Sequence, residues 1–244
     1  AFYKSKLSPV SKYLTGERGS ALTFDVLEYA IQSAHSLGLE LHAWVNPFRW
    51  SPSSTIKWNT TIDNDIYSKG WILETEKGKI FNPGIAEARQ YIVDVCKEIV
   101  GNYDIDGLVF DDYFYTSPTP EDATAGDYQL YRRSGTSMTI AQWRRNNINT
   151  FISQVYRMIQ NTKPYVMFGV SPAGVAKGGA MSAGIRPYNE TNASDWQYVK
   201  IYSDPIAWLK AKSIDYVSPQ LYWDTDHKTN PFGPLVKWWS YAAN

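Results

Sequence analysis

One short apolar run that ends in two carboxylates decides the fold of this chain: Gly107-Leu108-Val109-Phe110-Asp111-Asp112. A run of this length and composition is typical of a strand inside a parallel sheet. Helical periodicity precedes and follows it, as expected for a strand between two crossover helices. Ligands of parallel α/β folds bind at the carboxyl ends of the strands, so the two carboxylates stand where a functional site is expected.

Helical periods and short apolar runs alternate along the rest of the chain. The pattern predicts strands at 39–45, 107–111, 165–171 and 216–222, and helices at about 23–37, 82–100, 139–161, 205–212 and 234–244. Between the first strand and the second helix, residues 51–81 have the composition of a long polar loop. Within it, 71–74 and 79–81 are expected to pair as a hairpin.

Three local signals support the helix starts. Thr23 can cap the first helix, and Asn82-Pro83 combines a cap with a proline at the first helical position. Thr139 and Gln142 have the spacing of a capping box, which predicts the start of the third helix.

The predicted fold class is α/β. The length of 244 residues is close to the roughly 250 that are typical of one (β/α)₈ barrel, but such a barrel needs eight strands. Four strands with crossover helices form an open sheet with two exposed edges. We therefore expect about four core parallel strands and an open side, rather than a closed barrel.

Composition excludes several classes of function. Lys and Arg total 24 and so do Asp and Glu, which argues against a nucleic-acid binder. No apolar stretch approaches the roughly 18 residues of a membrane-spanning helix. Residues 1–4 do not look like a signal peptide, so we expect either that the protein is not exported or that its start has been removed. Aromatic residues make up 15% of the chain, and large rings with polar tips suit the binding of sugars, although most such rings are expected in the core.

We expect no metal and no cofactor. His35, His42 and His227 lack metal-ligand spacing, and neither a nucleotide-binding glycine motif nor a G-x-S-x-G elbow is present. The single cysteine, Cys96, excludes an intrachain disulfide and falls on the apolar side of a predicted helix.

Hydrogen-bonding and aromatic side chains gather at the predicted strand ends, a combination that suits a polyhydroxylated ligand with apolar ring faces. The candidate binding residues are His42, Trp44, Asn46, Arg49, Tyr113, Tyr115, Ser171, Gln220, Tyr222 and Trp223. His42 and Asn46 reach a ligand only if their side of the first strand faces the barrel axis, and a lone histidine of this kind is more often structural.

Asp111 and Asp112 are the strongest catalytic candidates. Strand alternation predicts that they point to opposite sides. Asp111 is favoured as the inward, reactive group, since Leu108 and Phe110 would then pack outward against helices. For Asp112, a structural role in orienting the backbone and a functional role are equally supported.

Glycoside hydrolysis uses two carboxyl groups of different pKa. Asp224, after the fourth strand, is the candidate for the second, with Asp226 a weaker choice. Both stand in a predicted loop, where a solvated surface role is at least as well supported.

Over essentially its whole length the chain resembles the glycosyl-hydrolase-like family 10 of bacterial envelope proteins. The blocks that carry the resemblance are Phe2-Tyr3-Lys4-Ser5-Lys6-Leu7, Tyr13-Leu14-Thr15-Gly16, the segment 34–47 ending in His42-Ala43-Trp44-Val45-Asn46-Pro47, Asn82-Pro83-Gly84, Asp106-Gly107 through Asp111-Asp112-Tyr113-Phe114-Tyr115, Phe168-Gly169-Val170-Ser171-Pro172, and Ser218-Pro219-Gln220-Leu221-Tyr222-Trp223.

The resemblance implies a (β/α)₈ barrel that hydrolyses glycosidic bonds outside the cytoplasm, with bacterial glycans such as cell-wall strands as substrates. Family members have two strands before the position of Phe2 and two after that of Trp223. The resemblance therefore predicts that residues 1–244 are a single, partial barrel domain that holds strands three to six. It also implies that Asp111 takes the position of the nucleophile of retaining barrel glycosidases.

Two hypotheses about function follow. The first is a glycosidase that uses Asp111 and a second carboxylate on an oligosaccharide or polysaccharide. The alternative is a non-catalytic carbohydrate-binding barrel whose cleft contains Trp44, Tyr113, Tyr115, Tyr222 and Trp223. A third, weaker hypothesis is a structural envelope protein without saturable glycan binding.

Overall fold

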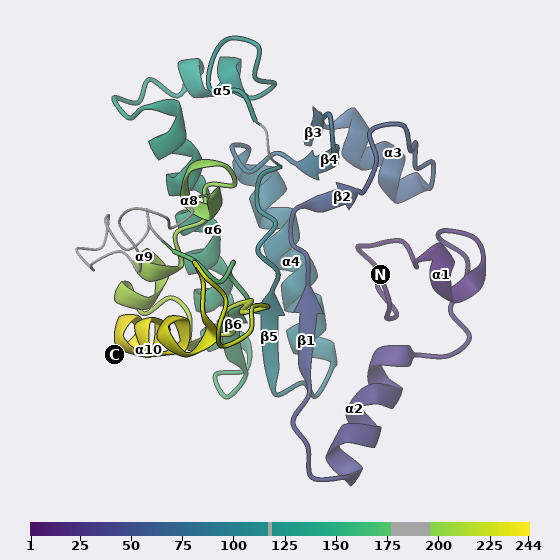
Figure 1. The fold of residues 1–244 in the computed structure, drawn as a ribbon. Helices are drawn as coiled ribbons and strands as arrows, with labels where there is room; N and C mark the ends of the chain where they lie inside the picture. Colours follow the sequence, from purple (N-terminus) through teal and green to yellow (C-terminus); the bar gives the residue numbers. More distant parts are fainter. Residues whose placement is uncertain (117–118, 177–195) are drawn as a thin grey trace.

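The computed structural model describes residues 1–116, 119–176 and 196–244 (Figure 1). Within these ranges the main sheet has four strands in the order β1-β5-β6-β7, and every pair is parallel. The strands are β1 (His42–Val45), β5 (Gly107–Phe110), β6 (Met167–Val170) and β7 (Tyr216–Val217). The α/β class and the four parallel strands are confirmed, although each strand is shorter than predicted.

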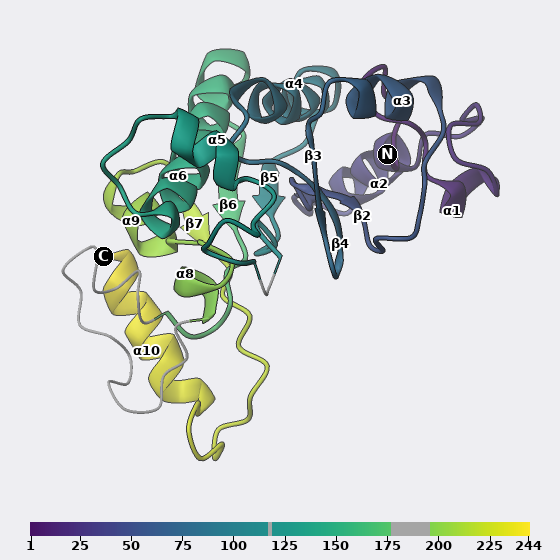
Figure 2. The ribbon, with the colours of Figure 1, turned by 90° about the horizontal axis from the view of Figure 1, so that it is seen from above.

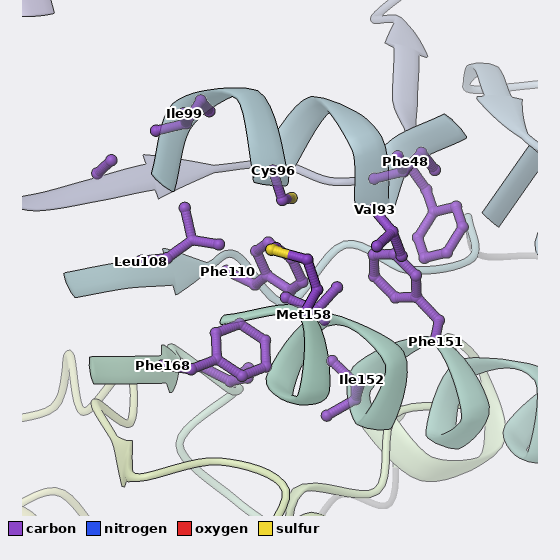
Figure 3. Packing of buried hydrophobic residues seen from close by; sticks show 14 of the residues in the cluster. Phe48, Val93, Cys96, Ile99, Leu108, Phe110, Phe151, Ile152, Met158 and Phe168 are labelled. Carbon is purple, nitrogen blue, oxygen red and sulfur yellow. The ribbon is translucent and has the colours of Figure 1, made fainter. Parts of the chain in front are cut away.

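One face of the main sheet packs against α4 (Ala86–Asn102) and α6 (Ile140–Thr162), which lie side by side (Figure 2). The side chains of Leu108, Phe110 and Phe168 point into this layer and are fully buried (Figure 3). Phe110 stacks on Phe151 of α6 with ring centroids 5.6 Å apart. Burial of each such side chain contributes about 1.5–3 kcal/mol to folding. Cys96 of α4 lies in the same cluster, as the periodicity predicts.

The opposite face carries Trp44, Val109, Gly169 and Tyr216 in register across the four strands. It is only partly covered, since Trp44 is 56% exposed whereas Val109 is buried. Gly169 leaves room for the Tyr216 ring, because a Cβ at this position would stand 2.1 Å from a ring carbon. The Tyr216 hydroxyl and Nδ1 of His42 form a hydrogen bond of 2.6 Å across this face.

A small antiparallel sheet lies beyond the carboxyl end of β1 (Figure 1). It contains β2 (Arg49–Ser51), β4 (Gly78–Phe81) and β3 (Ile72–Thr75) in that order. The hairpin of β3 and β4 is confirmed, and Gly78 adopts the positive φ of 139° that favours glycine there. The rest of the predicted polar loop is more ordered than expected, because it also holds α3 (Thr61–Ser68), which begins with a capping box, and β2 ends where the loop begins.

Two helix starts were predicted wrongly. The first long helix, α2 (Val26–Ser36), is capped by Asp25 rather than Thr23. The second, α4, begins after Asn82 and Pro83, because the Asn82 side chain instead accepts a hydrogen bond from the backbone of Gly84 and closes a turn. The capping box that begins α6 is present in full. The remaining helices of the described residues are α1 (Lys12–Thr15), α5 (Tyr128–Arg133), α8 (Trp196–Val199), α9 (Pro205–Lys210) and α10 (Phe232–Ala243).

In the described residues, β1 and β7 are the edge strands of the main sheet, which has an open side as predicted. The carboxyl ends of all four strands lie on one side of the molecule, where the small sheet and the loop after β5 rise beside them. That these strands are the third to sixth of a barrel stays a prediction.

Candidate functional site

Asp111 and Asp112 leave the carboxyl end of β5 together. The backbone N–H of Asp111 donates to Val45 of β1, which extends the ladder by one residue. The next N–H, of Asp112, turns back and donates to the Asp111 carboxylate over 2.8 Å. The expectation that the two side chains point to opposite sides is wrong, because alternation applies only while the strand continues. The two carboxyl groups instead lie within hydrogen-bonding reach of each other.

The two carboxyl groups differ in their exposure to water. Asp112 is 4% exposed, whereas Asp111 is half-buried. Burial, together with the hydrogen bond to Asp111 and its negative charge, raises the pKa of Asp112 from 3.8 to about 7. Two carboxyl groups in contact do not ionise together without a penalty, so Asp112 holds a proton at pH values below about 7.

Ser171 and Gln220 complete the surroundings of the pair. Ser171 follows β6, is buried, and its backbone N–H donates to Phe110 of β5. Gln220 forms a bridge with Ala173, and its amide donates to the Ser171 carbonyl over 3.1 Å. The Gln220 side chain also reaches Asp112 and opposes the rise of its pKa. Both predicted residues are therefore brought to the carboxyl pair.

Asn46 and Arg49 approach from β1. The side chain of Asn46 accepts a hydrogen bond from the backbone N–H of Arg49, which fixes the turn between β1 and β2. The Arg49 guanidinium lies over the ring of Tyr113, 4.6 Å from its centroid. Because Tyr113 directly follows Asp112, this stacking joins β2 to the loop that leaves the carboxyl pair.

Of the five aromatic candidates, three are exposed: Trp44, Tyr113 and Tyr222. Tyr115 is buried in a loop, which corrects the prediction that it contacts a ligand, whereas ligand contact by Trp223 stays a prediction. Tyr115 is 1% exposed and packs edge-on against Tyr202, with ring centroids 5.1 Å apart. Trp223 is half-buried beside Val175 and Leu235 of α10.

His42 lies at the wrong end of its strand to reach a ligand there. It pairs in register with Gly107, the first residue of β5, and its ring occupies the space that a Cβ on Gly107 would fill. Four strand residues separate it from the level of Asp111, a distance of about 13 Å. Its hydrogen bond to Tyr216 makes it a structural group of the sheet face.

Asp224 and its neighbour Asp226 are exposed in the loop between β7 and α10. In the part of the chain that the structure describes, no hydrogen bond or ion pair joins the Asp224 carboxylate to Asp111 or Asp112. A catalytic role for Asp224 therefore stays a prediction.

A buried ion pair that the sequence analysis missed fixes the loop after the carboxyl pair. Arg144 of α6 donates two hydrogen bonds to Asp127, and both side chains are fully buried. Its third donor binds the Tyr202 hydroxyl, which itself donates to Glu121. The sequence did contain a signal for this buried arginine. Arg144 stands four residues before Ile148 and therefore lies on the apolar face of its helix.

Two hollows border this region. A cleft of about 390 Å³ lies between the small sheet and residues 113–116. A cavity of about 520 Å³, lined mainly by apolar side chains, lies at the outer edge of β1 beside the amino terminus. Across residues 1–116, 119–176 and 196–244, no group of three or more His, Cys, Asp and Glu side chains is arranged to hold a metal ion.

The sequence profile of the family described as Glycosyl hydrolase-like 10 matches residues 1–243. The chain belongs to this family. The resemblance that the sequence blocks indicate is thereby confirmed.

Two curated relatives of this glycosyl hydrolase-like 10 chain are glycosyl hydrolase YngK of Bacillus subtilis (strain 168) and glycosyl hydrolase DigH of Escherichia coli (strain K12). The first is 34% identical over 250 residues, which cover 98% of this chain and 47% of YngK. The second is 32% identical over 250 residues, which cover 98% of this chain and 56% of DigH. The chain thus spans about half the length of these relatives.

Among solved structures, α-L-fucosidase isoenzyme 2 from Paenibacillus thiaminolyticus aligns with a TM-score of 0.48 and 16% identity, covering 75% of this chain and 26% of the fucosidase. A likeness at this TM-score and identity says nothing about the function of the present chain. In its described residues, no helix combines the length and the apolar character that crossing a membrane requires.

Proposed function

We propose that this chain forms the catalytic region of a glycoside hydrolase in which Asp111 is the reacting carboxylate and Asp112 its positioning residue. The observation that carries the proposal is the contact between a half-buried and a buried carboxyl group at the carboxyl end of β5. A buried carboxyl group with a raised pKa beside an accessible carboxylate, at the carboxyl end of a parallel strand, marks a candidate catalytic site.

The division of roles follows from exposure. Asp111 is accessible, and the ladder hydrogen bond to Val45 holds its backbone in place. When Asp112 is protonated, its hydroxyl can donate to the Asp111 carboxylate, so Asp112 positions Asp111 for reaction. The Asp111 carboxylate is then able to attack the anomeric carbon as the bond to the leaving oxygen breaks.

The leaving oxygen must receive a proton from a second carboxyl group. Retaining enzymes place their two groups about 5 Å apart, which is farther than two carboxyls in hydrogen-bonding contact. Asp112 is therefore unsuited to be that donor, and we assign the role to Asp224 in the loop after β7. Water then cleaves the bond between the sugar and Asp111 and restores the carboxylate.

The substrate that we propose is a bacterial polysaccharide, with cell-wall glycan strands first, cleaved outside the cytoplasm. The exposed rings of Trp44, Tyr113 and Tyr222 support a polyhydroxylated ligand, since sugar faces pack on aromatic rings. The choice of a bacterial glycan and an extracytoplasmic location rests on the family resemblance.

Release of reducing ends from a panel of bacterial glycans, including peptide-free cell-wall strands, tests the proposal. We expect release by the wild type and a loss of at least about 100-fold in the Asp111→Asn variant, because the reacting group is removed. The control is Asp94→Asn, which alters an exposed carboxylate on α4. Saturable binding without release would favour the carbohydrate-binding alternative instead.

A further inference from the structure

The cleft of about 390 Å³ adjoins the carboxyl pair, because Tyr113 and Thr116 line it on one side. Arg49 of β2 and Lys77 of the β3–β4 hairpin line it on the other side. The hairpin rises beside the loop after β5 at the carboxyl ends of the strands (Figure 2). A polymer that crosses Asp111 would thus extend into this cleft.

The lining of the cleft is cationic. Arg49, Lys77 and Lys79 line it, and no carboxylate does so in the described residues. Lys79 is neutralised, since its ammonium group lies 3.0 Å from the Glu74 carboxylate and donates to the Tyr67 hydroxyl. Arg49 and Lys77 have no carboxylate within ion-pair distance in the part of the chain that is described. Two uncompensated positive charges therefore face the cleft.

Arg49 is also held in position for recognition. Its guanidinium stacks on the Tyr113 ring at 4.6 Å, which restricts the side chain and leaves the edge of its donor fork open. A planar fork of this kind binds a carboxylate through two parallel hydrogen bonds. An ammonium group such as that of Lys77 adds charge without that geometry.

We propose that this cleft is a subsite for a sugar that carries a carboxylate, with Arg49 as the bidentate donor and Lys77 as a supporting charge. The inference rests on the proposed function and specifies it further: the preferred substrate is an acidic polysaccharide rather than a neutral one.

Matched ligands test the subsite without hydrolysis. The first is a peptide-free cell-wall oligosaccharide, in which every second sugar bears a lactyl carboxylate, and the second is the same oligosaccharide with each carboxylate reduced to a primary alcohol. Binding is measured by calorimetry on the Asp111→Asn protein. We expect the acidic form to bind at least about tenfold more tightly, as for a charged hydrogen bond.

Substitutions of the two cations test whether the preference for the acidic oligosaccharide arises in this cleft. In the Asp111→Asn background, Arg49→Gln should abolish most of the preference and Lys77→Gln should reduce it. The matched control is Lys97→Gln, an exposed lysine on α4, which should leave it unchanged. Both test side chains are exposed, so folding should tolerate either change.

The outcomes separate the two proposals. Equal binding of the acidic and the reduced form overturns the subsite and leaves the proposed function standing. A preference that survives in the Arg49→Gln, Lys77→Gln double variant also overturns it, because another site then recognises the carboxylate. If neither form binds, although cell-wall strands lead our proposal, the proposed substrate and the subsite fail together.

Discussion

At the scale of single residues, access to water separates Asp112 from Asp111. The two are adjacent in sequence and chemically identical, yet one is buried beside Gln220 and the other faces the open end of the strand. The difference arises because the chain turns directly after β5, so a buried and an accessible carboxyl group meet at one point.

The raised pKa of Asp112 predicts a pH dependence of stability. Its pKa is about 7 in the folded protein and near 3.8 when the group is solvated, so the folded state binds the extra proton between these values. The contribution of Asp112 to the free energy of unfolding is therefore complete below about pH 4 and is lost as pH rises through about 7.

Urea denaturation at pH 4 and pH 8 measures this effect in the wild type and in Asp112→Asn. The asparagine variant should gain stability relative to the wild type on going from the lower to the higher pH, because it has no carboxyl group to ionise. Asp94→Asn is the control, and its difference from the wild type should be the same at both pH values. An equal difference for Asp112→Asn as well would contradict the assignment.

The sequence allowed several site residues to be predicted but not their roles. Asp111, Ser171 and Gln220 follow apolar runs, so the ends of the parallel strands bring them together. Tyr115 follows the same pattern yet is packed into a loop, because alternation and strand position do not specify how a loop folds back. The register between strands was not predictable from the sequence either. Only the pairing of His42 with Gly107 shows that His42 stands at the amino end of its strand.

At the scale of elements, two glycines allow aromatic rings to cross the open face of the sheet. The Tyr216 ring lies on Gly169 and the His42 ring on Gly107, and a hydrogen bond joins the two side chains. This layer supports the strands beneath the carboxyl pair.

Gly169→Ala should destabilise the protein by about 1–3 kcal/mol, the usual penalty of forcing atoms into a packed region. Gly101→Ala is the matched control: it lies in the last turn of α4, where a Cβ would meet nothing closer than 4.0 Å. The control should be stabilising by about 0.4–1 kcal/mol. Thermal denaturation measures the stability of both variants. Equal stability of the two would contradict the close contact between Gly169 and the Tyr216 ring.

A second element-scale prediction concerns ion pairs. Arg144–Asp127 and Lys69–Asp65 have the same 2.6 Å separation, but the first pair is fully buried and the second is exposed. Arg144→Met should lower the free energy of unfolding by about 3–5 kcal/mol, because Asp127 is left buried and unpaired. Lys69→Met should change it by at most about 1 kcal/mol. Chemical denaturation compares the two, and similar losses would contradict the burial of the Arg144 pair.

The principal elements were predictable because four apolar runs and their intervening helices each bury one continuous face. The missed elements have weaker patterns. Strand β2 is only three residues long and is held by pairing with β4 rather than by its own composition. Helix α3 did leave a signal in its capping box of Thr60 and Asp63, within a segment too polar to show a helical face.

At the scale of the whole molecule, the described residues form an open four-stranded sheet with helices on one face and a small sheet beside its carboxyl edge. The two central strands, β5 and β6, have partners on both sides, whereas β1 and β7 have a partner on one side only. This asymmetry has a consequence for local stability.

Amide hydrogen exchange of the 244-residue chain should be slowest in β5 and β6 and faster in β1 and β7, because edge strands open at lower free energy. Mass spectrometry of exchanged peptides measures the order. Protection of β1 equal to that of β5 would show that its edge is covered, for example by another copy of the chain.

The central claim is that the glycosidic bond is broken at the Asp111–Asp112 pair. A crystal structure of the Asp111→Asn protein with a bound acidic oligosaccharide tests it most directly. We predict an anomeric carbon beside the side chain of residue 111, with a neighbouring sugar carboxylate on Arg49. An oligosaccharide bound elsewhere, such as in the cavity at the outer edge of β1, with no sugar in reach of residues 111 and 112, would contradict the account.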